Sequence, residues 1–270
     1  LIKSMYKYLL CIKWVLVGGS ILGVSALWLG CQTPTWMLRE PSSRASWLMI
    51  GDSHTVGAFG SGLLWQLDKE KTILDQDIAQ FAVTGSTIWN WQAGSFENLS
   101  LGFATKLPLR EKQISKGGPD SWSLTSLLKS FGSESVLIAL GTNDMAKGTP
   151  PDVEKFLQIL NGRRCLWILP PLINNIRFSI EAQELFYNQL KDSASRRGCQ
   201  VIDSRLIRDH SNEISDSQLA NWQNCIQAPG EKLIPDENDH IHFTTKKGRY
   251  WGRCVASAVR ALLKGDSATQ

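Results

Sequence analysis

The sequence predicts an α/β fold, a three-layer α/β/α domain in which a mostly parallel, five-stranded sheet lies between two layers of helices. Two observations support this fold class. Short apolar segments of strand length alternate along the chain with longer segments that have helical periodicity. No internal repeat or low-complexity tract interrupts the alternation. Such alternation is typical of βαβ units, whose crossover helices cover both faces of a parallel sheet.

Five apolar runs predict the strands, which are 46–51, 78–83, 135–140, 165–169 and 200–203. The first contains Trp47-Leu48-Met49-Ile50, which is apolar throughout, as a buried strand is. Helical patterns predict helices at 60–69, 122–131, 151–161, 179–197 and 246–264. Residues 86–120 are longer than a plain crossover and rich in Gly, Ser and Trp, so we expect them to cover part of the functional site. Residues 206–238 form a second irregular stretch.

Composition sets the outer limits on function. Apolar residues make up 43% of the 270 residues and charged residues 20%, which fits a folded globular protein of one large domain or two small ones. The formal net charge is +4, and Lys3, Lys7 and Lys13 account for three of these charges, so the rest of the chain carries +1. With no basic run interleaved with aromatic residues, nucleic-acid binding is excluded.

The first 31 residues have the order of a targeting segment. Three lysines precede an uncharged run, 14–30, that ends in a small residue before Cys31. This ending resembles a bacterial lipoprotein box, although Trp28 stands where Leu is usual, and it implies lipidation of Cys31. An uncleaved membrane anchor and a soluble secreted form are the alternatives. The lipoprotein, the anchored form and the secreted form are all extracytoplasmic, and the first two are membrane-anchored. We expect residues 32–46 to form a tether.

The body of the chain, 47–264, is then one domain, followed by a tail at 265–270. It contains four cysteines, which are Cys165, Cys199, Cys225 and Cys254. Two of them begin predicted strands, and if those strands are neighbours, Cys165 pairs with Cys199 and Cys225 with Cys254. Four reduced, buried thiols are the alternative. No two cysteines have the close spacing of a zinc site, so we expect no metal.

Polar residues stand at the ends of the predicted strands. Gly51-Asp52-Ser53-His54 ends the first strand, Gly85 follows the second, and Gly141-Thr142-Asn143-Asp144 follows the third. Asp239 and His242 precede the last helix. Because ligands bind outside the carboxyl ends of strands in open α/β sheets, we expect these residues to converge on one edge.

These four blocks, in this order, resemble those of the SGNH (GDSL-like) hydrolase family: Gly-Asp-Ser, a Gly, Gly-x-Asn-Asp and Asp-x-x-His. The resemblance spans about 47–262 and implies a flavodoxin-like fold. It also implies a serine esterase in which Ser53 is the nucleophile and His242 the base, with Asp239 orienting His242. The N–H groups of Ser53 and Gly85 and the Asn143 amide would form the oxyanion hole. This machinery needs no metal or organic cofactor.

Other residues near these blocks have weaker roles. His54 stands where the family motif has Leu, and we expect it to line the site. His210 and His240 lack the Asp three residues earlier that His242 has. Trp89 and Trp91 follow Gly85, and they either stack on sugar rings or pack the 86–120 stretch onto the sheet. Two acidic residues of the motifs, Asp52 and Asp144, are expected to accept backbone hydrogen bonds.

The first block, in its Gly-Asp-Ser-His-Thr form, resembles envelope carbohydrate esterases, including peptidoglycan O-acetylesterases. We therefore expect a carbohydrate deacetylase that acts through an acyl-Ser53 intermediate. Its partner would be an acetylated glycan or another small acyl ester, and it would meet the membrane through its N-terminal lipid or anchor. The alternatives are a lipase or lysophospholipase, a polysaccharide O-acetyltransferase, and a non-catalytic glycan-binding lipoprotein.

Overall fold

The computed structural model of this protein describes ten ranges of the chain. The described residues are 45–73, 77–96, 102–107, 112–115, 122–147, 152–173, 179–211, 221–227, 230–235 and 241–264. The predicted targeting segment with Cys31, nearly all of the tether, the tail at 265–270, and both Asp239 and His240 lie outside them. No helix within the described ranges is long and apolar enough to cross a membrane.

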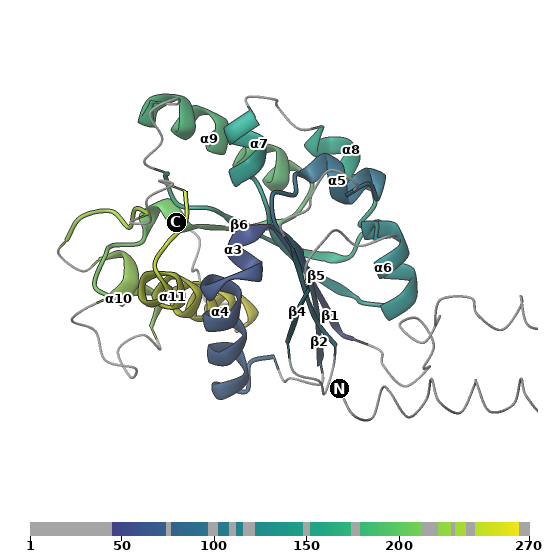
Figure 1. Cartoon of the computed structure of the whole chain (residues 1–270), viewed down its shortest axis with the longest axis horizontal. Helices are drawn as coiled ribbons and strands as arrows, with labels where there is room; N and C mark the ends of the chain where they lie inside the picture. The colour runs from purple at the N-terminus through teal and green to yellow at the C-terminus, as the bar shows by residue number, and fades with distance from the viewer. Residues whose placement is uncertain are drawn as a thin grey trace, which may run out of the picture. The chain divides into compact units, whose positions relative to one another are not determined.

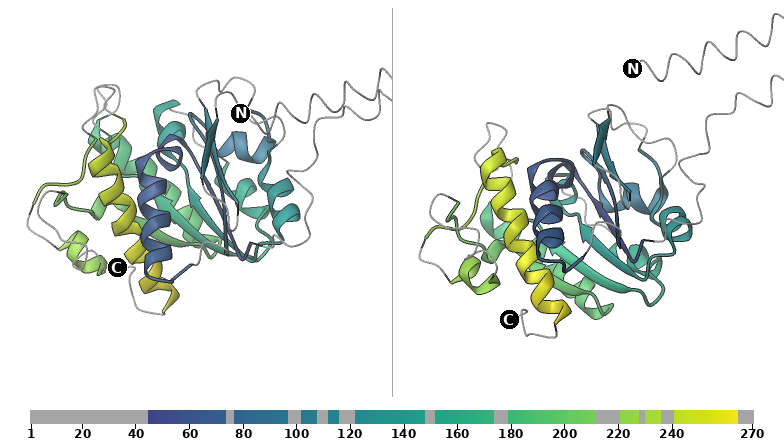
Figure 2. Two further views of the ribbon diagram at one scale, coloured as in Figure 1. Left: turned by 60° about the horizontal axis from the view of Figure 1, so that its bottom comes forward. Right: turned by 90° about the horizontal axis from the view of Figure 1, so that it is seen from below.

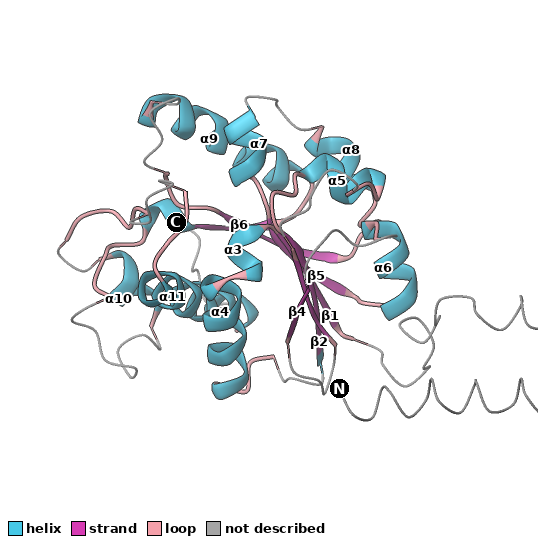
Figure 3. Cartoon of the chain, viewed as in Figure 1, coloured by secondary structure: helices cyan, strands magenta, loops and turns pink. Residues whose placement is uncertain are grey.

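One sheet of seven strands lies between two helical layers in the described part of the chain (Figures 1 and 3). The strands are β1 (Trp47–Gly51), β2 (Ile78–Val83), β3 (Phe103–Lys106), β4 (Gln113–Ser115), β5 (Ser135–Ala139), β6 (Arg164–Leu169) and β7 (Gln200–Asp203). Their order is β4-β3-β2-β1-β5-β6-β7. The five predicted strands are all parallel to their predicted neighbours and have the flavodoxin-like order 2-1-3-4-5. The predicted fold class is therefore confirmed.

The prediction of only five strands was wrong, because 86–120 adds β3 and β4 as antiparallel strands beside β2. All three residues of β4 are exposed. Such a strand is held by backbone pairing and leaves no apolar pattern in the sequence.

Helices cover both faces of the sheet. Five of them match the five predicted helices and are α4 (Ala58–Lys69), α6 (Leu124–Phe131), α8 (Val153–Gln158), α9 (Ile180–Arg196) and α11 (Thr245–Leu263). The others in the described ranges are α3 (Ser53–Val56), α5 (Ile88–Ala93), α7 (Thr142–Lys147), the 3-10 helix η3 (Ser204–Leu206) and α10 (Trp222–Ile226). Figure 1 shows α5 to α9 on one side of the sheet and α4, α10 and α11 on the other.

The strand β1 divides the core between these two layers. Leu48 and Ile50 belong to the cluster that α5, α6, α8 and α9 complete. Trp47 and Met49 belong to the cluster beneath α4, α10 and α11. Alternate residues of a strand point to opposite faces, and β1 is apolar throughout because both of its faces are covered.

Helices α4 and α11 pack side by side on the second face (Figure 2). A Cβ atom at Gly252 of α11 would lie 2.2 Å from the carbonyl oxygen of Phe59 in α4, so the two backbones touch. The Phe59 ring stacks on Trp251 with a centroid distance of 3.9 Å. This close packing fixes α4 and α11 together at the end where the chain passes Ser53 and His242.

Both predicted disulfides are confirmed. Cys165 in β6 is bonded to Cys199, which directly precedes β7, with a Cα–Cα distance of 4.5 Å. The parallel register aligns Leu166 with Gln200 and so brings these two cysteines together. The second disulfide joins Cys225 of α10 to Cys254 of α11.

Candidate active site

Ser53 and His242 meet at the carboxyl edge of the sheet, although 189 residues separate them in the chain. The distance between Ser53 Oγ and His242 Nε2 is 2.8 Å, the length of a strong hydrogen bond. Ser53 is the first residue of α3, which starts as soon as β1 ends, and His242 lies just before α11. A hydroxyl that donates to an unprotonated imidazole nitrogen is arranged for activation as a nucleophile.

Hydrogen bonds tie the ends of β1, β2 and β5 together around this pair. The Ser86 hydroxyl donates to the carbonyl of Gly51 at 3.3 Å, and the Asn143 amide donates to the carbonyl of Ser86 at 2.9 Å. The N–H of Ile88 donates to both carboxylate oxygens of Asp144 at 3.2 Å. The structure thus brings the Gly-Asp-Ser, Gly85 and Gly-x-Asn-Asp segments to one place.

Donors for an oxyanion are available at this edge. Gly85 has φ +76°, a left-handed conformation that favours glycine, and it carries no side chain that could block the approach of a substrate. Among the described residues, no backbone carbonyl outside the regular helices and strands accepts a hydrogen bond from the N–H groups of Ser53 and Gly85. The Asn143 amide has two hydrogens, and Ser86 occupies one of them.

Three aromatic residues singled out in the sequence take different positions. His54 is buried, with its ring 5.2 Å from that of His242 and edge-on to Trp251 at 5.1 Å, so it supports the His242 ring instead of facing solvent. Trp89 is 59% exposed on α5. Trp91 is fully buried, and its indole N–H donates to the Ser86 hydroxyl at 3.1 Å. Of the two tryptophans, Trp91 packs the core, and only Trp89 offers a free face.

Asp52 is a buried acid beside the proposed nucleophile. It is 2% exposed and accepts the N–H of His54 at 3.0 Å, which caps α3. Burial raises the pKa of the Asp52 carboxyl to about 7, against the opposing effects of the His54 N–H and of His242. As expected from the sequence, Asp52 and Asp144 both accept backbone hydrogen bonds.

Lys112 is a site residue that sequence reasoning missed. Its ammonium donates to the carbonyls of Thr55 at 2.9 Å and Val56 at 2.8 Å and to the hydroxyl of Ser61 at 3.2 Å. These acceptors lie where α3 ends, so Lys112 fixes the turn that carries Ser53. Burial lowers the pKa of the Lys112 ammonium to about 8. Nothing in the local sequence marks this lysine, because its partners come from a segment more than fifty residues away.

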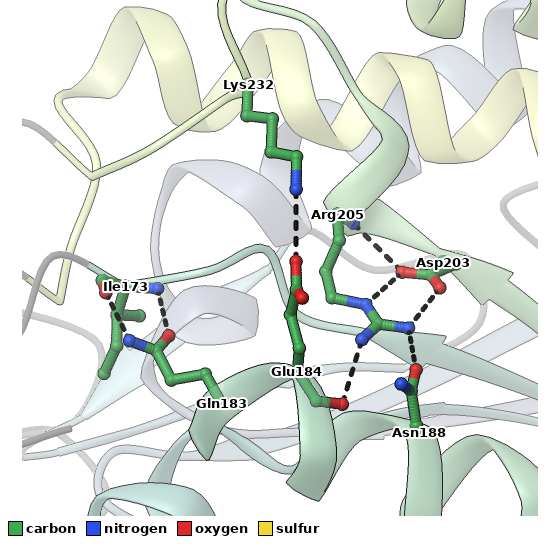
Figure 4. Close-up of polar contacts among 7 residues, drawn as sticks. All are labelled: Ile173, Gln183, Glu184, Asn188, Asp203, Arg205 and Lys232. Carbon is green, nitrogen blue, oxygen red and sulfur yellow. Dashed lines mark hydrogen bonds and ion pairs between the residues drawn. The ribbon is translucent and has the colours of Figure 1, made fainter. Parts of the chain in front are cut away.

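An ion-pair network fastens the chain after β7 to α9 (Figure 4). Arg205 bonds Asp203 through two nitrogens and also donates to the Asn188 side chain at 2.9 Å. Lys232 pairs with Glu184 of α9 at 3.2 Å. The Asp203–Arg205 pair is nearly buried and bidentate, which makes it the stronger of the two. These contacts join Arg205 and Lys232 to α9.

Among the described residues, no group of three His, Cys, Asp or Glu side chains could hold a metal ion.

Neither a protein-family model nor a curated protein sequence matches this chain. Among solved structures, it is similar to a carbohydrate acetylesterase family member from Sinorhizobium meliloti, at 18% identity and a TM-score of 0.47, over 81% of this chain and 99% of that one. TesA is similar at 14% identity and a TM-score of 0.47, over 78% and 96%. The M. smegmatis aryl esterase is similar at 17% identity and a TM-score of 0.45, over 81% and 100%. These values carry no inference about activity, which depends on the site itself.

Proposed function

We propose that this protein is a serine ester hydrolase that removes O-acetyl or other short acyl groups from a cell-envelope carbohydrate. The observation that carries the proposal is the 2.8 Å contact between Ser53 Oγ and His242 Nε2 at the carboxyl edge of the sheet. A nucleophile within hydrogen-bond reach of its base is the geometric requirement for acyl transfer. This contact lies at the carboxyl ends of β1 and β5, the point where the strand order reverses. Open α/β sheets bind their ligands at such a point.

The reaction would run in two halves. His242 takes the Ser53 proton as Oγ attacks the ester carbonyl carbon, and the proton then passes to the departing sugar oxygen, which leaves an acyl-Ser53 intermediate. Water, deprotonated by His242, attacks this intermediate and releases acetate and free Ser53. Asp239, outside the described residues, is proposed to orient His242 from the opposite ring nitrogen.

The oxyanion of each tetrahedral intermediate would be bound by Ser53 N–H, Gly85 N–H and the Asn143 amide. Each such donor contributes on the order of 3 kcal/mol to transition-state stabilisation. The Asn143 amide donates a hydrogen bond to the Ser86 carbonyl, and this bond fixes the amide before substrate arrives. Little reorganisation of the oxyanion hole is then needed during the reaction.

A carbohydrate substrate is supported by two features. The Gly-Asp-Ser-His-Thr form of the first block resembles envelope carbohydrate esterases, and the exposed Trp89 stands three residues after Ser86 with a face for a sugar ring. The lipoprotein-like segment ending at Cys31 would place the enzyme in the envelope, where acetylated glycans occur.

The test is acetate release from purified peptidoglycan and from other acetylated polysaccharides, with Ser53→Ala as the matched control. The wild type should release acetate, and the variant should lose at least about a thousandfold in rate while keeping its fold. Esters of p-nitrophenol with acetyl and longer acyl chains complete the test. A clear preference for long chains would replace the deacetylase proposal with a lipase.

A further inference from the structure

A pocket of about 510 Å³ is lined by residues of α4 and α11. Its lining is Ser61, Gly62, Trp65, Arg249 and Arg253. A volume of this size is in the range of small-ligand sites. No residue of the pocket belongs to the proposed catalytic set.

The pocket exists because the two helices meet without side chains between them. A Cβ atom at Gly62 would lie 2.6 Å from the carbonyl oxygen of Arg249, so the two backbones touch there. The space beside this contact is left to the larger side chains of Trp65 and Arg253.

The chemistry of the lining is aromatic and cationic. Trp65 is 48% exposed, although it is one of the largest apolar side chains. The Arg253 guanidinium lies 5.0 Å from the Trp65 ring centroid, and the Lys69 ammonium lies 4.6 Å from it. Arg249 adds a further exposed cation. None of the described residues that line the pocket is acidic.

The pocket is linked to the catalytic edge through Lys112. Ser61 accepts a hydrogen bond from Lys112, whose ammonium also binds the last carbonyls of α3, the helix that starts at Ser53. Arg249 follows His242 by seven residues. From the helix rise, Arg249 and Trp65 lie roughly 6 and 10 Å beyond the starts of α11 and α4.

We propose that this pocket binds a carboxylate-bearing sugar residue of the same polysaccharide whose ester Ser53 attacks. The Trp65 indole would pack against the apolar face of the sugar, and the exposed guanidinium of Arg249 would bind its carboxylate, a pairing for which guanidinium geometry is suited. The inference rests on the proposed function, because it assumes a glycan substrate. It assigns that glycan an acidic character.

Binding is measured in the Ser53→Ala background, so that the result does not depend on hydrolysis. Isothermal titration calorimetry with oligogalacturonide, a carboxylated glycan, is compared with a neutral chitooligosaccharide. We expect Arg249→Gln to weaken oligogalacturonide binding about tenfold, the equivalent of one charge-assisted hydrogen bond. Trp65→Ala should weaken it by a similar factor. Arg164→Gln, which removes an exposed arginine at the start of β6 on the opposite edge, should change nothing.

In the catalytically intact protein, hydrolysis of p-nitrophenyl acetate should be unchanged by Arg249→Gln, because that ester is too small to reach the pocket. The inference is overturned if oligogalacturonide does not bind, if it binds equally to the Arg249→Gln variant, or if Arg164→Gln weakens it as much. Preferential binding of a glycerol phosphate polymer would overturn the carboxylate assignment. If binding follows the expected pattern but no ester is hydrolysed, the proposed function fails and the pocket assignment stands.

Discussion

Replacing the buried Asp52 by Asn should change how the stability of the protein depends on pH. The side chain is 2% exposed and lies beside the negatively charged Asp144, so its ionised form is disfavoured in the folded state. The substitution keeps an oxygen that can accept the His54 N–H, so the cap of α3 survives. What it removes is the ionisation.

The sign and size follow from the pKa. Burial raises the pKa of Asp52 from 3.8 to about 7, so between these values the folded protein binds a proton that the unfolded chain has released. Stability is therefore greatest below about pH 4 and falls as pH rises to about 7. The whole effect is roughly 4 kcal/mol, and about 3 kcal/mol of it falls between about pH 5 and about pH 8.

Urea unfolding followed by tryptophan fluorescence measures this effect, with the disulfides kept oxidised. The free energy of unfolding of Asp52→Asn, minus that of the wild type, should be about 3 kcal/mol larger at about pH 8 than at about pH 5, because only the wild type loses this stability as pH rises. Groups that do not interact with Asp52 titrate alike in both proteins and cancel in this difference. An equal difference at both pH values would refute the assignment of a neutral, buried Asp52.

Three further substitutions test the supports of the site. Lys112→Met should lower kcat for p-nitrophenyl acetate about tenfold and stability by about 1–3 kcal/mol, because the carbonyls at the end of α3 lose their donor; wild-type kcat would contradict this role. Replacing Cys165 and Cys199 together by Ser should cost about 3–4 kcal/mol, measured by urea unfolding, because their disulfide closes a loop of 34 residues. A cost near zero would show that the bond does not constrain the unfolded chain. Gly252→Ala should cost about 1–3 kcal/mol and lower Tm, because its Cβ would meet the backbone of α4; an unchanged Tm would mean that α4 and α11 separate easily.

The sequence predicts the parallel core of the fold well, because each of its strands is buried on both faces and so is apolar. It does not predict β4, whose exposed residues follow no pattern, or α3 and α7, which are too short to show a helical period. The Cys165–Cys199 pairing is predictable because it follows from the order of neighbouring strands, and it leaves Cys225 and Cys254 to pair with each other.

The candidate site is predictable in part. Four motif blocks mark Ser53, Gly85, Asn143 and His242, since all lie at strand ends or before the last helix. The buried positions of His54 and Trp91 depend on packing that no local pattern reveals. Lys112 is found only in the structure, because its role arises from contacts with a distant segment.

The most direct test of the central claim is covalent trapping of the nucleophile. The wild-type protein is treated with a reactive phosphonate ester, digested, and analysed by peptide mass spectrometry. We predict one phosphonyl adduct, on Ser53, with loss of esterase activity in proportion to labelling and no adduct in Ser53→Ala. An active enzyme that carries its adduct on another residue, or that resists labelling, would contradict the assignment of Ser53 as the nucleophile.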